Sequence, residues 1–224
     1  IRDAISLYGY SSYNTIDKCK IIDIKNRGIL ISEGIINKVS NTTIINCESG
    51  IEFYGDSFIG HDSELNEIDN CLISKNSKYG ILIMPDCHYN KVINCEISNN
   101  KYGLITQLDT YKNRIYYNEF IDNIEYQAYD AGKNIWNNSY PFGGNFCIDY
   151  NGIDQNSGPG QNIVGCDGIG DIPYEIPGGK NVDYYPLVPI DSEEPIVKIE
   201  KPTSKLYLFN KCIRKFYSNR LPLI

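Results

Sequence analysis

The stretch that decides the fold is residues 66–76, NEIDNCLISKN, which is followed by YGILI at residues 79–83. Twenty-four residues later the chain repeats this arrangement as NKVINCEISNN, residues 90–100, followed by YGLI at residues 102–105. A third copy, NRIYYNEFIDN, begins at Asn113. Self-similarity at a period of this length is the sequence signature of a repeat architecture. The chain is therefore predicted to be a stack of short, equivalent units.

Two looser copies lie upstream, at residues 17–31 and 41–53. Each copy holds one strand-like piece around an Asn-Cys element and another after a Gly, separated by residues that tolerate a left-handed backbone. The 25 Asn and 36 Ile in the chain fit many short strands joined by tight turns. Leucine-rich repeats would need regularly spaced Leu, and helical repeats a 3.6-residue apolar rhythm, and the copies show neither. We predict an all-β parallel β-helix with coils of about 22–24 residues, because so short a unit must stack on its neighbours.

Equivalent side chains of such coils form columns along the stack. Cys47, Cys71 and Cys95 recur at intervals of 24 residues, with Cys19 one coil earlier. We predict that they form one inward column and that a second column contains Ile44, Ile68, Val92 and Ile115. A thiol column suits soft metals, but the favoured interpretation is a small apolar side chain in a narrow interior. The recurrent Asn residues are interpreted as ladders that hydrogen-bond the turn backbone.

The repeat ends near Trp136 and gives way to a Gly- and Asp-rich closing segment. Its candidate metal ligands are four carboxylates on Gly-rich backbone, which are ingredients of a structural Ca²⁺ site: Asp149, Asp154, Asp167 and Asp171. The alternative is that these residues cap turns in a segment that covers the open end of the solenoid, as solenoids require. A disulfide between Cys147 and Cys166 is also open.

The closing segment carries a family resemblance. Residues 144–154 read G-N-x-x-x-D-Y-x-G-x-D, residues 167–179 read D-G-I-G-D-x-P-Y-x-I-x-G-G, and residues 183–187 read D-x-Y-P-L. Together with the Asn-rich coils, these motifs resemble the NosD-like right-handed parallel β-helix family over residues 13–190. That family includes the periplasmic copper-site maturation factor and many secreted surface proteins, common in archaea. The sequence departs from it at Cys147, where the family usually has Trp.

The resemblance implies a right-handed helix and an extracellular or cell-surface location. We expect β-helix coils over residues 1–140, a cap over 141–190, and a linker with the truncated start of an immunoglobulin-like module over 191–224. The N-terminus begins Ile-Arg-Asp without Met, so a longer precursor is expected. The net charge of −7 argues against nonspecific binding of nucleic acid or anionic membranes. No apolar run approaches the roughly 18 residues of a membrane span, so no membrane insertion is expected.

The favoured function is a noncatalytic one. Tyrosines recur near one-coil spacing, and outward tyrosines are able to stack on sugar rings, although stacked aromatics also simply stabilise coils. We predict that they bind a polysaccharide, a cell-surface glycoprotein or another neighbouring surface protein, and the candidate residues are Tyr79, Tyr102, Tyr111, Tyr116 and Tyr126.

Two alternatives come from other classes. A polysaccharide lyase or hydrolase needs paired carboxylates on one face, and the candidates are Glu48, Glu52, Glu119, Asp122 and Glu125. A copper-site maturation factor needs soft donors, and its candidates are His61, Met84, Cys87 and His88. Both carboxylates on a solvated sheet face and histidines in exposed turns are common without either function, which leaves the noncatalytic interpretation in front.

Overall fold

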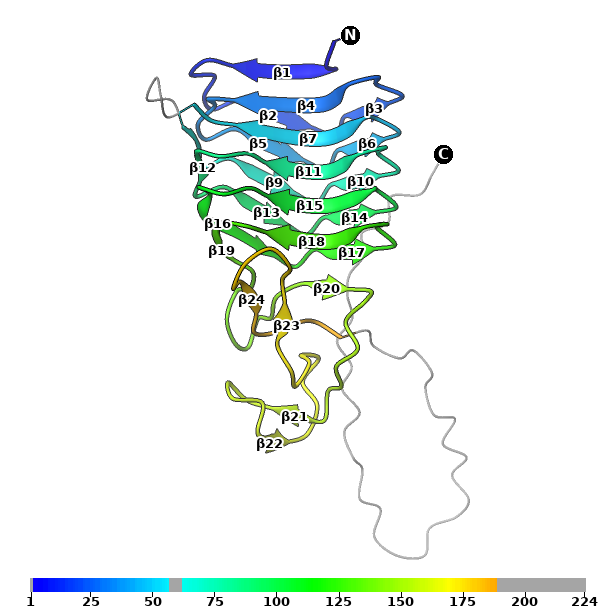
Figure 1. The fold of residues 1–224 in the computed structure, drawn as a ribbon, viewed down its shortest axis with the longest axis vertical. Coiled ribbons are helices and arrows are strands. Elements are labelled where there is room, and N and C mark those ends of the chain that lie inside the picture. Colours follow the sequence, from blue (N-terminus) through cyan, green and yellow to red (C-terminus); the bar gives the residue numbers. More distant parts are fainter. Residues whose placement is uncertain (1, 57–61, 189–224) are drawn as a thin grey trace, which may run out of the picture.

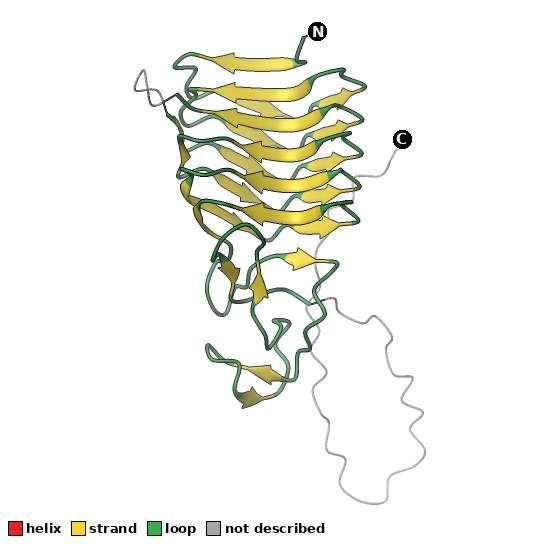
Figure 2. Ribbon diagram, in the orientation of Figure 1, coloured by secondary structure: helices red, strands yellow, loops and turns green. Residues whose placement is uncertain are grey.

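The computed structural model of the chain describes residues 2–56 and 62–188. These residues form 24 strands and no helix, and most strands stack in parallel as successive coils of a solenoid (Figures 1 and 2). The predicted all-β parallel β-helix is therefore confirmed. None of the described residues belongs to a helix long and apolar enough to cross a membrane.

Three parallel sheets run along the stack, and each coil contributes to all of them. Sheet A is six-stranded, and neighbouring strands pair in register along the order β1 (Ile5–Tyr8), β4 (Arg27–Ser32), β7 (Ser49–Tyr54), β11 (Tyr79–Ile83), β15 (Tyr102–Thr106) and β18 (Tyr126–Asp130). Sheet C is also six-stranded and contains β3 (Lys20–Ile22), β6 (Thr43–Ile45), β10 (Leu72–Ser74), β14 (Glu96–Ser98), β17 (Glu119–Ile121) and β20 (Phe146–Cys147).

Sheet B is eight-stranded and forms the remaining wall. Its members are β2 (Thr15–Asp17), β5 (Lys38–Ser40), β8 (Ser63–Glu64), β9 (Glu67–Asp69), β12 (Cys87–His88), β13 (Lys91–Ile93), β16 (Tyr111–Tyr116) and β19 (Lys133–Ile135). The long strand β16 pairs with both β12 and β13, which lie on the same coil. Sheet B thus has two parts, which β16 joins. The short strands β8 and β12 lie at one corner, and β9 and β13 form the rest of the wall.

Two antiparallel pairs follow the coils in the sequence. They are β21 (Asn156–Ser157) with β22 (Ile163–Val164), and β23 (Tyr174–Glu175) with β24 (Val182–Asp183). In Figure 1 the pair β23–β24 lies beside β20 and the pair β21–β22 lies beyond it. Both pairs lie within residues 141–190, where the cap is expected, although β20 in the same range still belongs to sheet C. The expected linker and immunoglobulin-like module, residues 191–224, lie outside the described residues.

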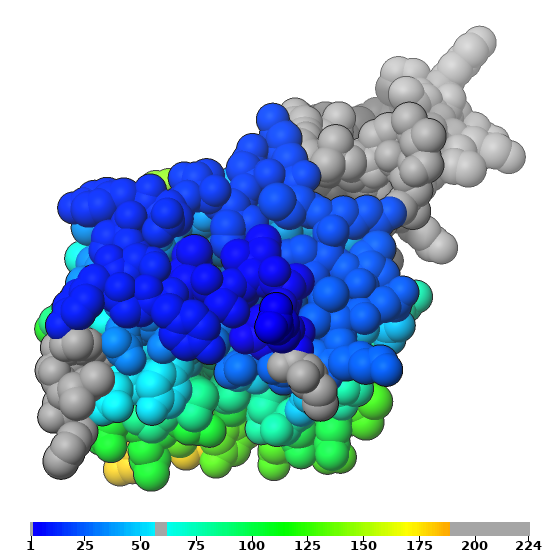
Figure 3. Space-filling model, turned by 90° about the horizontal axis from the view of Figure 1, so that it is seen from above, coloured from blue at the N-terminus to red at the C-terminus, as the bar shows by residue number. Residues whose placement is uncertain are grey.

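Each of the three sheets contributes a continuous apolar column to the interior, and sheet A contributes a second inward column that begins with Ile31, Phe53 and Ile83. The members of the first three columns are almost entirely buried, and the pairing registers place them one above the other: Ile29, Ile51, Ile81, Leu104 and Ala128 in sheet A; Ile16, Val39, Ile68, Val92 and Ile115 in sheet B; Ile21, Ile44, Ile73, Ile97, Phe120 and Cys147 in sheet C. Viewed along the stack, the side chains of the first coil cover its end (Figure 3). Burial of these columns supplies the main favourable term in folding.

The predicted cysteine column is correct for Cys71 and Cys95 and wrong for Cys47. Leu72 pairs with Glu96, so the two cysteines that precede them are vertical neighbours. Leu72 also pairs with Thr43, which places Thr42, not Cys47, in the cysteine column. For the same reason Ile44 belongs to the sheet C column and Val39 takes its predicted place beside Ile68.

An insertion explains the error. Equivalent residues are 23 or 24 apart in most coils, as in the bonds from Asn100 to Asn123 and from Asn76 to Asn100. Across the chain segment that contains residues 57–61 the interval is 29, as between Cys47 and Asn76. A 24-residue count through this longer coil therefore reaches the wrong corner. Burial above all holds the pKa of Cys95 well above its ordinary value, so this thiol of the column stays protonated.

Three ladders of buried asparagine hold the corners. In the first, each residue donates its backbone N–H and its side-chain N–H to the Oδ1 atom of the asparagine one coil along; Asn37 bonds Asn66 at 2.9 and 3.0 Å, and Asn66 bonds Asn90 at 2.9 Å by both donors. The ladder continues through Asn113 to Asn134. The second runs through Asn118 and Asn145, and the third through Asn76, Asn100 and Asn123.

The last full coil turns the sheet A interior polar. In the second inward column of sheet A, Phe53 and Ile83 are followed by Thr106 and then by Asp130, which is fully buried. The Asp130 carboxylate accepts hydrogen bonds from Trp136 Nε1 at 2.7 Å and from Asn134 Nδ2 at 2.9 Å. A buried carboxylate needs such donors, and they come from the chain that leaves the coil.

A second buried carboxylate, from the cap, ends another ladder. Asp183 Oδ2 accepts the backbone N–H of Asn145 at 2.7 Å, and Oδ1 accepts that of Tyr185 at 3.0 Å. Asp183 is 1% exposed, and burial raises its pKa to about 7, although the N–H donors oppose this shift. The cap is thus hydrogen-bonded to Asn145, directly before β20, through the Asp183 carboxyl group, whose pKa lies near neutral pH.

The ladders lead to a first prediction. Replacing Asn90 by Ala removes the oxygen that accepts two N–H groups of Asn66, and it leaves the backbone N–H of Asn66 and the carbonyl oxygen of Ser63 without partners. Each buried group left unsatisfied costs about 1–3 kcal/mol, so the free energy of unfolding should fall by at least about 2 kcal/mol in a urea titration. The control is Asn94→Gly, an exposed corner residue with φ 53°, which should change it by less than about 1 kcal/mol. Equal losses in the two variants would contradict the role of the ladder.

The cap carboxylate leads to a second prediction. The pKa of Asp183 is raised in the folded state, so its contribution to stability is fully present below about pH 4 and is lost as the pH rises through about 7. Between these limits the loss is at most about 1.4 kcal/mol per pH unit. Asp183→Asn cannot ionise, so its unfolding free energy should decline less than that of the wild type from pH 5 to pH 8. Parallel curves for the two proteins would show that this carboxyl does not couple the cap to pH.

Candidate functional site

Three of the five predicted tyrosines form one vertical column in sheet A, where each is the first residue of its strand. Tyr79 pairs with Tyr102, and Tyr102 pairs with Tyr126. Their rings are stacked, with centroids 5.5 Å apart in the first pair and 6.3 Å in the second, and with interplanar angles of 29° and 21°. Tyr126 is 42% exposed and the other two are half-buried. The tyrosine column, Tyr79–Tyr102–Tyr126, therefore presents aligned aromatic edges and faces to the surface.

Lysines flank this column. Lys78 Nζ lies 5.0 Å from the ring centroid of Tyr79, and Lys101 Nζ lies 5.3 Å from that of Tyr102. Both lysines also line a shallow pocket on the adjoining corner, which includes Ile24 and Glu48. An apolar ring face beside fixed positive charge is a combination suited to an anionic, ring-shaped ligand.

The remaining two predicted tyrosines lie on another wall, so the expectation of one five-membered stripe is wrong. Tyr111 begins β16 in sheet B and stacks on His88, with ring centroids 3.6 Å apart. Tyr116 ends the same strand and is buried. Their spacing from Tyr102 is shorter than a coil, which is why the chain has already turned a corner when it reaches them.

The four predicted metal-binding aspartates accept hydrogen bonds from nearby groups of the cap. Asp154 accepts the backbone N–H groups of Asp167 and Gly168 at 3.1 and 2.7 Å, and Asp171 accepts those of residues 155 and 156. Asp167 accepts the N–H of Ile169, and Asp149 accepts the hydroxyl of Tyr174. Within the described residues these four do not form a group of converging metal ligands. Turn capping accounts for their positions, and Ca²⁺ binding stays a prediction.

The proposed staple between Cys147 and Cys166 is not formed. Both are free thiols, the first buried in the sheet C column and the second half-buried. Burial raises the pKa of Cys147 well above its ordinary value, so this side chain acts as a small apolar residue. Cys147, which stands where the family usually has Trp, thus still occupies an inward position of the apolar interior.

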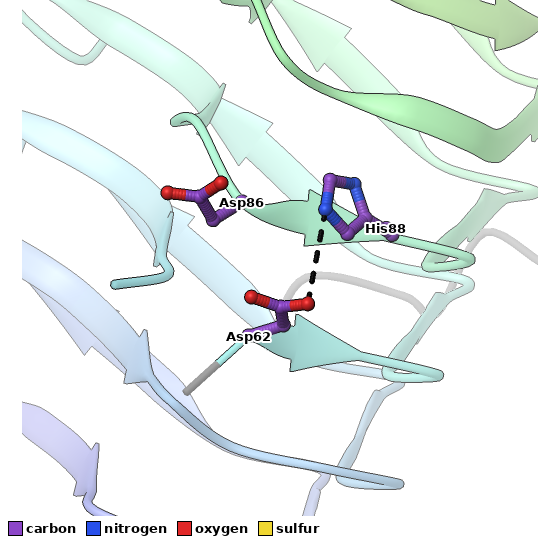
Figure 4. A group of neighbouring side chains, drawn as sticks. All are labelled: Asp62, Asp86 and His88. Atoms are coloured by element: carbon purple, nitrogen blue, oxygen red, sulfur yellow. Dashed lines mark ion pairs between the residues drawn. The ribbon is translucent and has the colours of Figure 1, made fainter. Parts of the chain in front are cut away.

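A group that the sequence did not predict lies at the corner of sheet B. Asp62, Asp86 and His88 offer one ligand atom each, and these atoms lie within 4.8 Å of one another (Figure 4). Asp62 immediately precedes β8, and Asp86 immediately precedes β12; because Cys87 pairs with Ser63, the two aspartates occupy equivalent places on adjacent coils. The signal in the sequence was an Asp beside each of two short strands, which becomes visible only when the register is known.

The copper alternative rested on four residues, of which His61 lies outside the described residues. His88 belongs to the group just described. Cys87 is fully buried, its Sγ lies 3.5 Å from the Pro85 carbonyl oxygen, and burial raises its pKa. Cys87 does not belong to the group of converging ligands found among the described residues. Met84, Cys87 and His88 alone therefore do not form a cuprous site, and no step of copper delivery is derived from them.

The fold defines a parallel β-helix repeat protein. A family model described as "Periplasmic copper-binding protein (NosD)" matches residues 2–152, more than half of the chain. The chain belongs to this NosD family, as its sequence motifs suggested. The description places the family in the periplasm, which agrees with the expected location outside the cytoplasm. Searches of curated proteins and of solved structures found no match.

The calcium prediction for the cap has a direct test. If Asp149, Asp154, Asp167 and Asp171 do bind Ca²⁺, saturating Ca²⁺ should raise the melting temperature by a few degrees, because a ligand that binds only the folded state stabilises it. Asp154→Asn should abolish that rise. A melting temperature that neither Ca²⁺ nor a chelator changes would leave turn capping as the full role of these residues.

Proposed function

We propose that this periplasmic-family β-helix is a noncatalytic binding protein whose tyrosine column engages carbohydrate outside the cytoplasm. The observation that supports the proposal is the alignment of Tyr79, Tyr102 and Tyr126 in one stacked file. Sugar rings have apolar faces that pack on aromatic side chains, and an extended polysaccharide matches a site that repeats along an axis. The interstrand spacing of about 4.8 Å sets the repeat of the tyrosines.

The flanking charges narrow the sugar class. The protein as a whole is acidic, with a net charge of −7, yet Lys78 and Lys101 lie beside the column. A local positive surface on an acidic protein favours anionic ligands at that place alone. The proposed ligand is accordingly a polysaccharide that contains sugar acids, free or carried by a neighbouring surface glycoprotein.

Binding is tested with the full chain against neutral and uronate-containing polysaccharides, by calorimetry or on a glycan array. The double variant Tyr79→Ala/Tyr102→Ala should lose about tenfold or more in affinity, since each aromatic contact contributes about 0.5–1.5 kcal/mol. Tyr184→Ala serves as the control, because this tyrosine is 59% exposed in the cap and away from the column. Affinity for the acidic polysaccharide should fall with added salt.

Three outcomes would overturn the proposal. Absence of binding to every polysaccharide would show that carbohydrate is not the ligand. Unchanged binding in the double variant would show that the tyrosine column is not the binding site. Release of reducing or unsaturated ends, abolished by Glu119→Gln, would instead support the polysaccharide lyase or hydrolase alternative.

A further inference from the structure

The corner of sheet B holds a second site, separate from the tyrosine column. Asp62 and Asp86 lie one above the other on adjacent coils, and His88 follows two residues after Asp86 on β12. The three side chains approach one another from two coils, and the imidazole ring lies beside both carboxylates in Figure 4. His88 Nε2 is 3.9 Å from Asp62 Oδ2, which is beyond hydrogen-bonding distance.

The histidine ring is buried without ordinary polar partners. His88 is 4% exposed, and its Nδ1 atom has no hydrogen-bond partner among the described residues. Leaving a buried polar atom unpaired is unfavourable. The ring is nevertheless fixed in orientation, because it stacks on Tyr111 with an interplanar angle of 22°. The other ring nitrogen, Nε2, faces the Asp62 carboxylate, and a rigid imidazole nitrogen beside two carboxylates is an arrangement that a cation would bind.

The donor set selects the cation. Two carboxylate oxygens and one imidazole nitrogen are ligands of Zn²⁺ and similar divalent transition metals, which often take three protein ligands and keep one open position. Ca²⁺ requires six to eight oxygen ligands, and Cu(I) requires soft sulfur donors, which the buried Cys87 does not provide. Donor atoms about 2.1 Å from a tetrahedral ion lie about 3.4 Å apart, so the observed separations need only a small closing movement of the aspartates.

We propose that Asp62, Asp86 and His88 form a binding site for a divalent transition-metal ion of borderline hardness, represented by Zn²⁺, and that the ion links two adjacent coils. This assignment differs from a cuprous site, and it does not depend on carbohydrate binding. The ion would offset the mutual repulsion of the two carboxylates and bind Nε2 of the imidazole. Its open position would face the solvent, since Asp62 is 34% exposed at its side chain.

The test uses the full chain stripped of metal. Titration with Zn²⁺ should show one equivalent bound, and saturation should raise the melting temperature, because the ion binds the folded arrangement of two coils. Asp62→Asn, Asp86→Asn and His88→Ala should each lower the Zn²⁺ affinity by about tenfold or more. Asp109→Asn, an exposed turn aspartate on the next coil, is the matched control and should bind Zn²⁺ as the wild type does.

His88→Ala also removes the stack on Tyr111, so the two aspartate variants carry the test if that protein unfolds. No Zn²⁺ binding by a chain with intact β circular dichroism would overturn the proposal, as would equal affinity in the wild type and both aspartate variants. Cu(I) bound at these residues under reducing conditions, with Zn²⁺ excluded, would show that the site is a soft one instead.

Discussion

The register between coils is the constraint on which the rest of the molecule depends. A strand that slips by one residue turns every inward side chain outward, and short strands of three residues have little hydrophobic pattern to prevent this. The asparagine ladders supply what the strands lack. Each Oδ1 atom accepts two hydrogen bonds from one residue of the neighbouring coil, so a shifted coil would leave several buried polar groups unpaired at once. The asparagine ladders align the corners of successive coils. The apolar columns, the tyrosine column and the aspartates of sheet B are aligned as a result.

Much of the architecture was predictable from the sequence, for a physical reason. A short coil has no independent core, so the chain must reuse the same solution in each coil, and the recurrence of Asn, Ile and Gly at matching places reveals it. What failed was the assignment of Cys47 and Ile44, because a fixed period does not allow for the longer coil between them and their neighbours. Pairing in space, and not spacing along the chain, decides which residues share a column.

The candidate site residues were also predictable only in part. Tyr79 and Tyr102 were predictable, because each begins a strand and precedes a Gly and an aliphatic run, and Tyr126 follows Tyr102 at the 24-residue period. Tyr111 and Tyr116 were misplaced, since residue type and approximate spacing do not tell one wall of the solenoid from another. Asp62 and Asp86 are one 24-residue period apart, but aspartates are common in the turns of this chain, so the interval alone did not single them out. The pairing of Cys87 with Ser63 is what places them beside each other and near His88.

The buried Asp130 has a consequence for how such a protein changes in length. Its carboxylate occupies the place of an inward aliphatic residue and is satisfied by Trp136 and Asn134 from the departing chain. A duplicated unit inserted higher in the stack would meet aliphatic neighbours above and below and would extend every ladder. The same unit inserted after Asp130 would set an isoleucine against a desolvated charge and separate it from its donors. The effect of duplicating a unit therefore depends on where it is inserted. A new coil is tolerated within the stack, whereas the buried charge of the last coil prevents another coil from being added after it.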